Sequence, residues 1–307
     1  MRAAVCGSPI AHSLSPALHR AAYAELGLTD WSYDLLEVDE ARLPALVESL
    51  DTGWAGLSLT MPLKQAIVPL VDEVSDFARA VGSVNTVLVQ PRLDRAHLPG
   101  RRAVRLRAEN TDVLGLVTAL AQAGAGRIER GVVLGGGATA RSAVVALLQA
   151  GCPRPVAVVR SPDRAAELTA TAARLGGEVE IRGWDELPVA LTADVVVSTV
   201  PASAGAALAD ALLAAFRPVW WPLLLDVVYA PWPTTLARSW RGPVVGGFEM
   251  LLHQAAAQVR LMTGLEPPVE VMRAAGSAEL RRRSEGVDLA APAQVGGPAG
   301  RQRTGDS

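Results

Sequence analysis

Short apolar runs alternate with segments of helical spacing over the first third of the chain. Strand-like runs lie at 3–6, 31–38, 54–59 and 84–89, and segments with the spacing of helices lie at 16–26 and 40–50. Ser15 followed by Pro16 is typical of a helix start. Strands that alternate with helices predict an α/β fold with a largely parallel sheet.

After Asp112 the same rhythm becomes a βαβ unit. Strands at 132–134 and 156–159 flank a helix over 139–149, and further buried strands are expected at 193–198 and 223–228. A long helix runs from Gly246 to Gly264, and a short helix follows Pro267-Pro268. This second unit has the pattern of a Rossmann-type fold.

The last part of the chain loses this periodicity. Beyond Gly276 the composition reduces largely to Arg, Gly, Pro, Ala and Ser. We expect 276–307 to be a disordered tail, and a chain that ends at Gly276 to keep its activity. The arginine-rich stretch 91–107 is interpreted as a solvated hairpin loop rather than a nucleic-acid patch.

A glycine-rich turn joins the strand and helix of the βαβ unit and fits the pattern G-x-G-x-x-A. Its glycines let the backbone approach a pyrophosphate, whose charge the helix N-terminus stabilises. A tight turn without a ligand is the alternative. The predicted cofactor-binding residues here are Gly135, Gly137, Ala138, Thr139 and Ala140.

The second strand of the unit ends in Arg160-Ser161, with Arg164 shortly after. NAD-binding proteins usually carry Asp or Glu at this strand end to accept the ribose hydroxyls. A guanidinium instead pairs with a 2′-phosphate. These residues favour NADP as the cofactor.

Composition and charge exclude several other classes of protein. A net charge of −2 and a pI near 6.1 give no reason to expect nucleic-acid or membrane binding. Cys6 and Cys152 are far apart, which excludes a disulfide framework and suits a reducing cytoplasm. The apolar run at the N-terminus is too short for a signal sequence, and no run is long enough for a membrane span. We expect a cytoplasmic protein.

The basic residues are almost all arginine. Of 29 basic residues, one is lysine, Lys64, and the chain has two asparagines, Asn85 and Asn110. Lysine can shift its pKa and transfer protons, whereas arginine stays charged. The single lysine and the two asparagines all lie between 64 and 110, and this clustering suggests a chemical role for Lys64. Drift in a GC-rich coding sequence would also leave a single lysine.

Polar segments occur where core packing does not require them. Together with the glycine turn they form an ordered set: Gly7–Pro16, Thr60–Lys64, Val84–Thr86, Asn110–Asp112, Asp226–Tyr229 and Gly247–Gln254. With these residues the chain resembles the shikimate dehydrogenase family from Met1 to about Ala275. The sequence departs from the family pattern at Ser58, where asparagine is frequent, and at Val113, where glycine usually follows the aspartate.

The resemblance implies reversible, NADPH-dependent reduction of 3-dehydroshikimate to shikimate in aromatic amino-acid biosynthesis. It implies that Lys64 and Asp112 form the catalytic pair. The substrate's carboxylate and hydroxyls would be held by Ser13, Ser15, Thr60, Asn85, Tyr229 and Gln254. It adds to the cofactor site Thr199, Val227, Gly247 and Met250. The chemistry agrees, because an ammonium stabilises or protonates the oxygen of a ketone that receives hydride.

The resemblance also implies an organisation into two α/β domains with a cleft between them. The substrate domain would comprise 1–112 and the returning helices 247–275, and the NADP domain 113–246. No metal site is expected, because His12, His19, His97 and His253 are scattered. A small-molecule substrate and a monomer or homodimer are expected.

Several of these residues have structural alternatives. Ser15 and Asp112 could serve as helix N-caps, Asn85 could stabilise a turn, and Tyr229 could pack in the core beside Trp232. Three rival functions remain open. They are a quinate/shikimate dehydrogenase that uses NAD, an enzyme related to methylene-tetrahydrofolate dehydrogenase, and a non-catalytic NADP-binding sensor.

Overall fold

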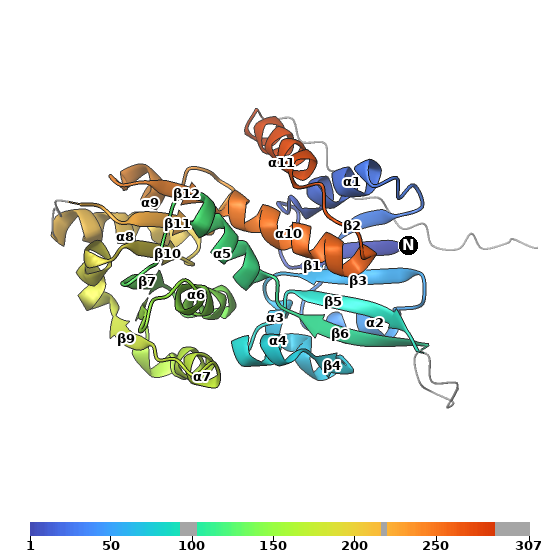
Figure 1. Cartoon of the computed structure of the whole chain (residues 1–307), viewed down its shortest axis with the longest axis horizontal. Coiled ribbons are helices and arrows are strands. Elements are labelled where there is room, and N and C mark those ends of the chain that lie inside the picture. The colour runs from blue at the N-terminus through green and yellow to red at the C-terminus, as the bar shows by residue number, and fades with distance from the viewer. Residues whose placement is uncertain (93–102, 216–219, 286–307) are drawn as a thin grey trace, which may run out of the picture.

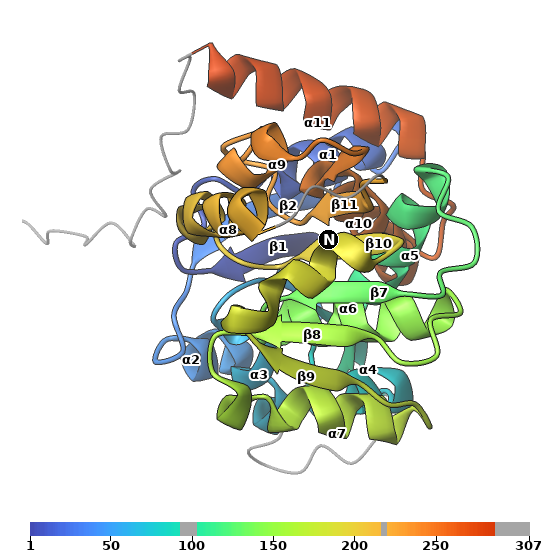
Figure 2. The same ribbon diagram turned by 90° about the vertical axis from the view of Figure 1, so that its left-hand side faces the viewer.

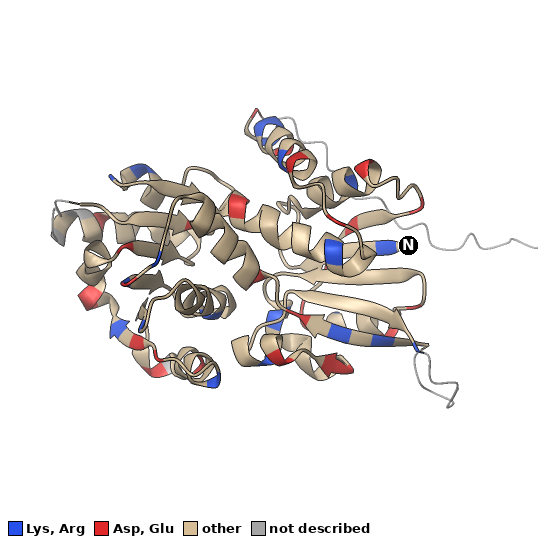
Figure 3. Ribbon diagram, viewed as in Figure 1, with Lys and Arg blue, Asp and Glu red and all other residues tan. Residues whose placement is uncertain are grey.

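The computed structural model describes residues 1–92, 103–215 and 220–285, which form two lobes that each contain a six-stranded sheet (Figure 1). The long helix α10 (Gly247–Thr263) and helix α5 (Asp112–Gln122) pack against each other where the lobes meet. Most strands in the middle of the two sheets carry no charged residues (Figure 3). No helix in these described ranges has the length and apolar character needed to cross a membrane.

The sheet of the first lobe has the order β2-β1-β3-β5-β6-β4. Its strands are β1 (Arg2–Gly7), β2 (Ser32–Glu37), β3 (Trp54–Leu59), β4 (Glu73–Val74), β5 (Thr86–Pro91) and β6 (Val104–Glu109). β1 pairs in parallel with β2 and β3, whereas β5 is antiparallel to β3 and β6. The sheet is therefore mixed, which corrects the expectation of a largely parallel one for this lobe.

The hairpin between β5 and β6 accounts for the mixed sheet. Pro91 pairs with Val104, and the two strands that follow each other in the chain run antiparallel, as in a hairpin. The arginine-rich stretch 91–107 therefore contains a hairpin, as expected, but 104–107 is strand rather than loop. Residues 93–102 lie outside the described ranges.

Helices cover both faces of the first sheet because side chains along a strand alternate between its faces. Ala3 and Val5 face α1 (Ser15–Glu25), α10 and α11 (Val269–Ser284), whereas Ala4 and Cys6 face the opposite side. The helices on that side are α2 (Leu43–Glu48), α3 (Leu63–Ala66), η1 (Val68–Leu70) and α4 (Asp76–Val81).

The sheet of the second lobe is parallel at every described pairing and has the order β12-β11-β10-β7-β8-β9. Its strands are β7 (Gly131–Leu134), β8 (Val156–Val159), β9 (Glu180–Gly183), β10 (Val195–Ser198), β11 (Leu223–Asp226) and β12 (Val244–Gly246). The chain moves outward from β7 in one direction and then returns to β10 on its other side. This is the Rossmann order, and it confirms the α/β prediction.

Alternation along the strands again separates two layers of helices (Figure 2). Val195 and Val197 pack with α5, α6 (Ala138–Gln149) and α7 (Ala166–Arg174). Val196 packs with η3 (Trp184–Thr192), α8 (Ala202–Ala215) and α9 (Thr235–Ser239). A single turn, η2 (Pro162–Arg164), follows β8.

Helix α11 corrects the boundary of the predicted tail. It continues to Ser284, so residues 276–284 are helical, and the remainder of the predicted tail, 286–307, lies outside the described ranges. The helix shows little apolar periodicity because its buried residues are only Met272 and Gly276. A Cβ on Gly276 would lie 2.6 Å from Phe248 Cε2 and 2.7 Å from Leu18 Cδ2, so the glycine lets α11 approach α10 and α1.

Candidate active site

Lys64 lies on α3, a single helical turn that directly follows β3. Leu63 before it and Ile67 after it are fully buried and fix the turn in the core. The Lys64 carbonyl accepts a hydrogen bond from the Val84 amide at 3.0 Å, which ties α3 to the segment before β5. This bond places Lys64 beside Asn85, a neighbour that the sequence spacing alone does not reveal.

Asp112 accepts hydrogen bonds from both residues. Lys64 Nζ donates to Asp112 Oδ2 at 2.5 Å, and Asn85 Nδ2 donates to Asp112 Oδ1 at 2.8 Å. The side chain of Asp112 is 5% exposed and that of Lys64 is 13% exposed. The lysine therefore lies at the solvent-facing side of the group, with the carboxylate behind it.

The amide of Asn85 has its partners within the same group. Its nitrogen also donates to Thr111 Oγ1 at 2.9 Å and to Gln254 Oε1 at 3.2 Å, and its oxygen accepts from the Thr111 amide at 2.8 Å. Asn85 thus holds Asp112, Thr111 and Gln254 in one arrangement. Thr111 was part of a motif in the sequence but had no assigned role.

Gln258 supports this arrangement from behind and was missed in the sequence. It donates to the Asn85 carbonyl at 3.2 Å and to Thr86 Oγ1 at 2.9 Å, and it accepts from Ser58 Oγ at 2.7 Å. Ser58 in turn accepts from the Tyr33 hydroxyl at 2.6 Å, which gives the departure from the family pattern at Ser58 a structural role. One signal was available, because Gln258 follows Gln254 by one helical turn on the same face.

Ser15 and Asp112 were considered as N-caps of the helices that they begin, and the structure places other residues at both N-cap positions. Leu14 occupies the N-cap position of α1, so Ser15 is its first helical residue. Thr111 occupies the N-cap position of α5, and the Val113 amide is bound by Asn110 Oδ1 at 3.2 Å rather than by Asp112. Neither Ser15 nor Asp112 is therefore the N-cap of its helix.

Gly115 brings Gln254 to the group. A Cβ at this position would lie 2.6 Å from the Met250 carbonyl oxygen and 3.1 Å from Gln254 Cβ, so a glycine is required for α10 to cross α5 this closely. The glycine stands one turn after Asp112 on α5. The crossing thereby sets the position of Gln254 relative to Asp112.

The other predicted substrate-binding residues all carry hydroxyl groups: Ser13, Ser15, Thr60 and Tyr229. Ser13 and Ser15 are buried at the start of α1, and Thr60, at the end of β3, is half-buried. Burial raises the pKa of the Tyr229 phenol, while the positive charge of Arg283 and hydrogen bonds from the Leu14 backbone and the Ser13 side chain oppose that rise. Tyr229 thus lies next to residues 12–15, which we call the serine loop, and the ring centroids of His12 and Tyr229 are 6.4 Å apart.

Asp226 fixes the turn that presents Tyr229. Its carboxylate accepts from Thr234 Oγ1 at 2.6 Å and from the Val228 amide at 3.2 Å. Burial raises the pKa of this carboxyl group, and the two hydrogen bonds oppose the rise. The first residue of the D-x-x-Y segment therefore has a structural role, while Tyr229 faces the loop.

The glycine turn lies where the strand order of the second sheet reverses. Gly135 has φ +117°, and a Cβ there would lie 2.5 Å from Thr199 Oγ1. Gly137 is the N-cap of α6, and Ala138 and Thr139 begin the helix. Because β7 and β10 are neighbours, the turn and Thr199 share the edge at which such sheets bind ligands.

A hollow of about 240 Å³ adjoins this turn and is lined by Gly136, Val159, Arg160, Ser161 and Ala165. Arg160 is exposed and immediately follows β8. Arg164 ends η2, and its side chain lies outside the described part of the chain. The strand end that carries Arg160 and Ser161 thus opens next to the glycine turn, as the sequence predicted.

The other predicted cofactor residues divide into two groups. Val227 follows β11, and a Cβ on Gly247 would overlap the Val227 carbonyl, so these two backbones touch. Ala140 and Met250 are buried in the core of the second lobe. Among the residues described, no group of three or more His, Cys, Asp or Glu side chains has the arrangement of a metal site.

Two family models match parts of the chain. The shikimate dehydrogenase substrate binding domain matches residues 5–87, and the shikimate 5′-dehydrogenase C-terminal domain matches residues 247–275.

Known proteins match over most of their length. A shikimate dehydrogenase (NADP(+)) of Moorella thermoacetica is 35% identical and is aligned over 88% of this chain and 90% of its own. The crystal structure of Mycobacterium tuberculosis shikimate dehydrogenase has a TM-score of 0.77 at 41% identity, covering 90% of this chain and 99% of that one. A quinate dehydrogenase of Corynebacterium glutamicum in complex with NAD has a TM-score of 0.76 at 27% identity, covering 91% of this chain and 99% of that one.

Proposed function

The chain belongs to the shikimate dehydrogenase family, and we propose on this basis that it catalyses the reversible, NADPH-dependent reduction of 3-dehydroshikimate to shikimate in aromatic amino-acid biosynthesis. We propose Lys64 and Asp112 as its catalytic pair. The observation that carries the proposal is the hydrogen-bonded group of Lys64, Asp112 and Asn85, built from three separate segments of the chain.

The residues at the second sheet fit an NADP cofactor. The Cβ space of Gly135 is taken by Thr199, so the turn has a shape that other residues could not adopt, and its backbone amides precede a helix N-terminus. Arg160 and Ser161 line the adjoining hollow, where an NAD-binding protein would usually carry an acidic residue. NADPH bound there supplies the hydride that reduces the ketone.

Lys64 acts at the ketone oxygen. Its ammonium group has three donors, of which one is used by Asp112, so the others can point at an oxygen that gains negative charge. Asp112 keeps the ammonium oriented, and Asn85 keeps Asp112 oriented. A general acid or charge-stabilising group in such a position contributes about 10²–10⁴ in rate.

The two polar groups suit the two ends of the substrate. Asp112 and Gln254 offer acceptor oxygens, Gln254 Nε2 has a second N–H beyond its bond to the Leu251 carbonyl, and Asn85 holds both residues in place. The group therefore offers both donors and acceptors, as the hydroxyl groups of a polyol require. Ser13, Ser15 and Tyr229 offer hydroxyl donors, as a carboxylate requires. We propose that the carboxylate binds at the serine loop and the ring hydroxyls near Asp112, with Thr60 between the two groups.

The proposed division into domains follows from these assignments. The substrate domain would comprise 1–112 and the helices from Gly247 onward, now including α11 to Ser284, and the NADP domain 113–246. We propose that the substrate lies in a cleft between them, that the enzyme acts in the cytoplasm as a monomer or homodimer, and that small molecules are its ligands.

Oxidation of shikimate with NADP, followed as absorbance of NADPH, tests the function. Parallel assays with quinate and with NAD separate it from the quinate dehydrogenase alternative, which the solved Corynebacterium structure makes a concrete rival. We expect shikimate with NADP to give the highest kcat/KM. Absence of turnover with shikimate and either cofactor would contradict the proposed function.

A further inference from the structure

Arg283 on α11 binds the backbone of the serine loop, 270 residues away in the sequence. Its Nη1 donates to the His12 carbonyl at 2.6 Å, and its Nη2 donates to the Ser13 carbonyl at 3.1 Å. The planar guanidinium thus donates hydrogen bonds to the carbonyls of two successive residues, a geometry that lysine cannot reproduce. Figure 2 shows α11 lying along α1, the helix that this loop begins.

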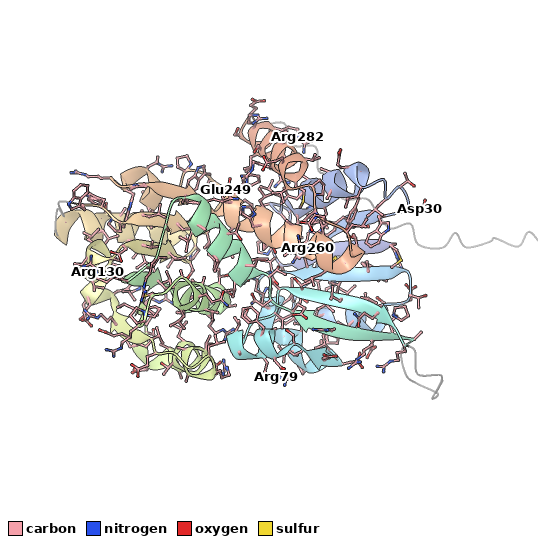
Figure 4. The ribbon with its side chains drawn as sticks, viewed as in Figure 1. Asp30, Arg79, Arg130, Glu249, Arg260 and Arg282 are labelled. Carbon is pink, nitrogen blue, oxygen red and sulfur yellow. The ribbon has the colours of Figure 1, made fainter. Side chains whose placement is uncertain are left out.

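Glu279 holds the guanidinium in place. Arg283 Nε donates to Glu279 Oε1 at 2.7 Å, one turn earlier on the same helix. The neighbouring Arg282, labelled on α11 in Figure 4, pairs with the other oxygen of Glu279. Two guanidinium groups therefore share one carboxylate, and the cluster keeps a net positive charge.

This charge adjoins the residues proposed to bind the carboxylate. The peptide group whose carbonyl Arg283 holds, that of Ser13, carries the Leu14 amide, and the Leu14 backbone and the Ser13 side chain both oppose the rise in the pKa of Tyr229. A guanidinium on the carbonyl side of a peptide group polarises the N–H on the other side. Arg283 is near enough to Tyr229 to affect it electrostatically.

We propose that Arg283 is a positioning residue for the carboxylate subsite: it fixes the serine loop and adds positive potential behind Ser13 and Tyr229. This inference rests on the proposed function. It extends the site to the C-terminal helix, a region that the sequence assigned to a dispensable tail. Arg283 does not touch the substrate in this proposal but acts through the loop.

The test compares shikimate with its methyl ester, which lacks the negative charge. The variants are Arg283→Met, Arg283→Lys and, as a matched control, Arg281→Met, which removes the same charge from an exposed position two residues away. For each variant, kcat and KM of both substrates are measured at saturating NADP. The KM of NADP is measured separately, at saturating shikimate. Circular dichroism and thermal unfolding check that each variant is folded.

We expect Arg283→Met to lower the ratio of kcat/KM for shikimate over the ester by about tenfold, mainly through KM, since charge-assisted hydrogen bonds have about this strength. Arg283→Lys, which keeps the charge, should recover part of the ratio and gives the answer if Arg283→Met does not fold. The KM of NADP and the Arg281→Met variant should stay within about twofold of wild type.

Each of the following outcomes would overturn the inference. Equal losses on shikimate and ester would reduce Arg283 to general support of the fold, and an equal effect of Arg281→Met would make it a non-specific charge effect. A wild-type protein that oxidises shikimate while Arg283→Met leaves the ratio unchanged refutes this inference alone. A wild-type protein inactive on shikimate refutes the proposed function and the inference with it.

Discussion

Asp112 accepts hydrogen bonds from two side chains at once, those of Lys64 and Asn85. The positions of these two partners indicate which kinetic constant should change when one of them is removed. Lys64 lies on its solvent-facing side and Asn85 on its buried side. Removal of Lys64 takes away the group proposed to meet the ketone oxygen, while Asn85 and Gln258 still hold Asp112 and its surroundings. Chemistry should suffer more than substrate binding.

We therefore expect Lys64→Ala to lower kcat by about 10² or more with little change in the KM of shikimate. Steady-state kinetics with NADP measure both constants. Arg79→Ala, at an exposed ion pair on α4, controls for the loss of one positive charge and should retain normal kcat. An unchanged kcat in Lys64→Ala would remove the lysine from the mechanism.

Arg160 determines cofactor preference in this proposal because it lines the hollow next to the glycine turn. Arg160→Asp should lower the ratio of kcat/KM for NADP over NAD by about tenfold or more, since a carboxylate repels a 2′-phosphate and accepts ribose hydroxyls. Arg154→Asp, before the other end of β8, makes the same charge change and should leave the ratio alone. If the two variants behave alike, the preference depends on other residues.

His19 is fully buried and stacks on Tyr33 with 3.9 Å between ring centroids. Burial lowers its pKa from 6.5 to about 3. Between these values the unfolded chain binds a proton that the folded chain does not, so the free energy of unfolding falls as the pH falls below 6.5.

From pH 7 to pH 5 this effect should cost about 2 kcal/mol. His19→Phe keeps the stacking and removes the titration, so its stability should fall by about 2 kcal/mol less than that of the wild type over the same interval. Urea unfolding at the two pH values measures the difference. Parallel losses in both proteins would show that His19 does not contribute.

At the scale of elements, the crossing of α5 and α10 couples the two lobes. Alanine usually stabilises a helix relative to glycine, by up to about 1 kcal/mol, so Gly115 in α5 and Gly205 in α8 offer a matched pair. A Cβ on Gly115 would press on the Met250 carbonyl at 2.6 Å, whereas one on Gly205 would find its nearest neighbour at an ordinary 3.6 Å.

Gly115→Ala should destabilise the protein by about 1–3 kcal/mol and raise the KM of shikimate, because Gln254 moves with α10. Gly205→Ala should be neutral or stabilising by up to about 1 kcal/mol. Thermal unfolding and steady-state kinetics of both variants provide the comparison. A stabilised Gly115→Ala would mean that the crossing can relax without cost.

Element α11 also changes what truncation should do. A chain ending at Gly276 was expected to be fully active, but such a chain lacks Glu279 and Arg283 and therefore the contact with the serine loop. Activity loss on truncation is now the expected outcome.

At the scale of the whole molecule, hydrogen bonds join α4 of the first lobe to α7 of the second. Thr171 Oγ1 donates to the Val81 carbonyl at 3.0 Å, and Arg174 Nε donates to the Ala80 carbonyl at 2.9 Å. Thr171 is fully buried, so loss of its hydroxyl removes a hydrogen bond from the Val81 carbonyl at a place where water does not readily replace it.

Thr171→Val should lower the free energy of unfolding by about 1–3 kcal/mol. Thr192→Val removes the same kind of bond, to the Val189 carbonyl, at an exposed site within one lobe and should cost less than about 0.5 kcal/mol. Calorimetry measures both. Equal effects would mean that the contact between the lobes contributes no more than an exposed turn.

The sequence by itself determined the α/β class, the Rossmann unit, the glycine turn with Arg160 behind it, and the polar segments that contain Lys64, Asn85 and Asp112. Each of these is local, because hydrophobic period, turn chemistry and motif spacing act over a few residues. The fold class and the family assignment depended on such local signals.

Only the tertiary structure decided which residues and elements that are remote in sequence are neighbours in space. The hairpin made the first sheet mixed, and Gly115 and Gly276 mark close helix contacts that no periodicity announces. Gln258 and Arg283 were missed because their partners, Asn85 and the serine loop, are remote in sequence. The second half of helix α11, residues 276–284, was mistaken for tail because Gly276 and ion pairs such as that of Arg283 with Glu279 hold it, and packing of that kind leaves no apolar repeat in the sequence.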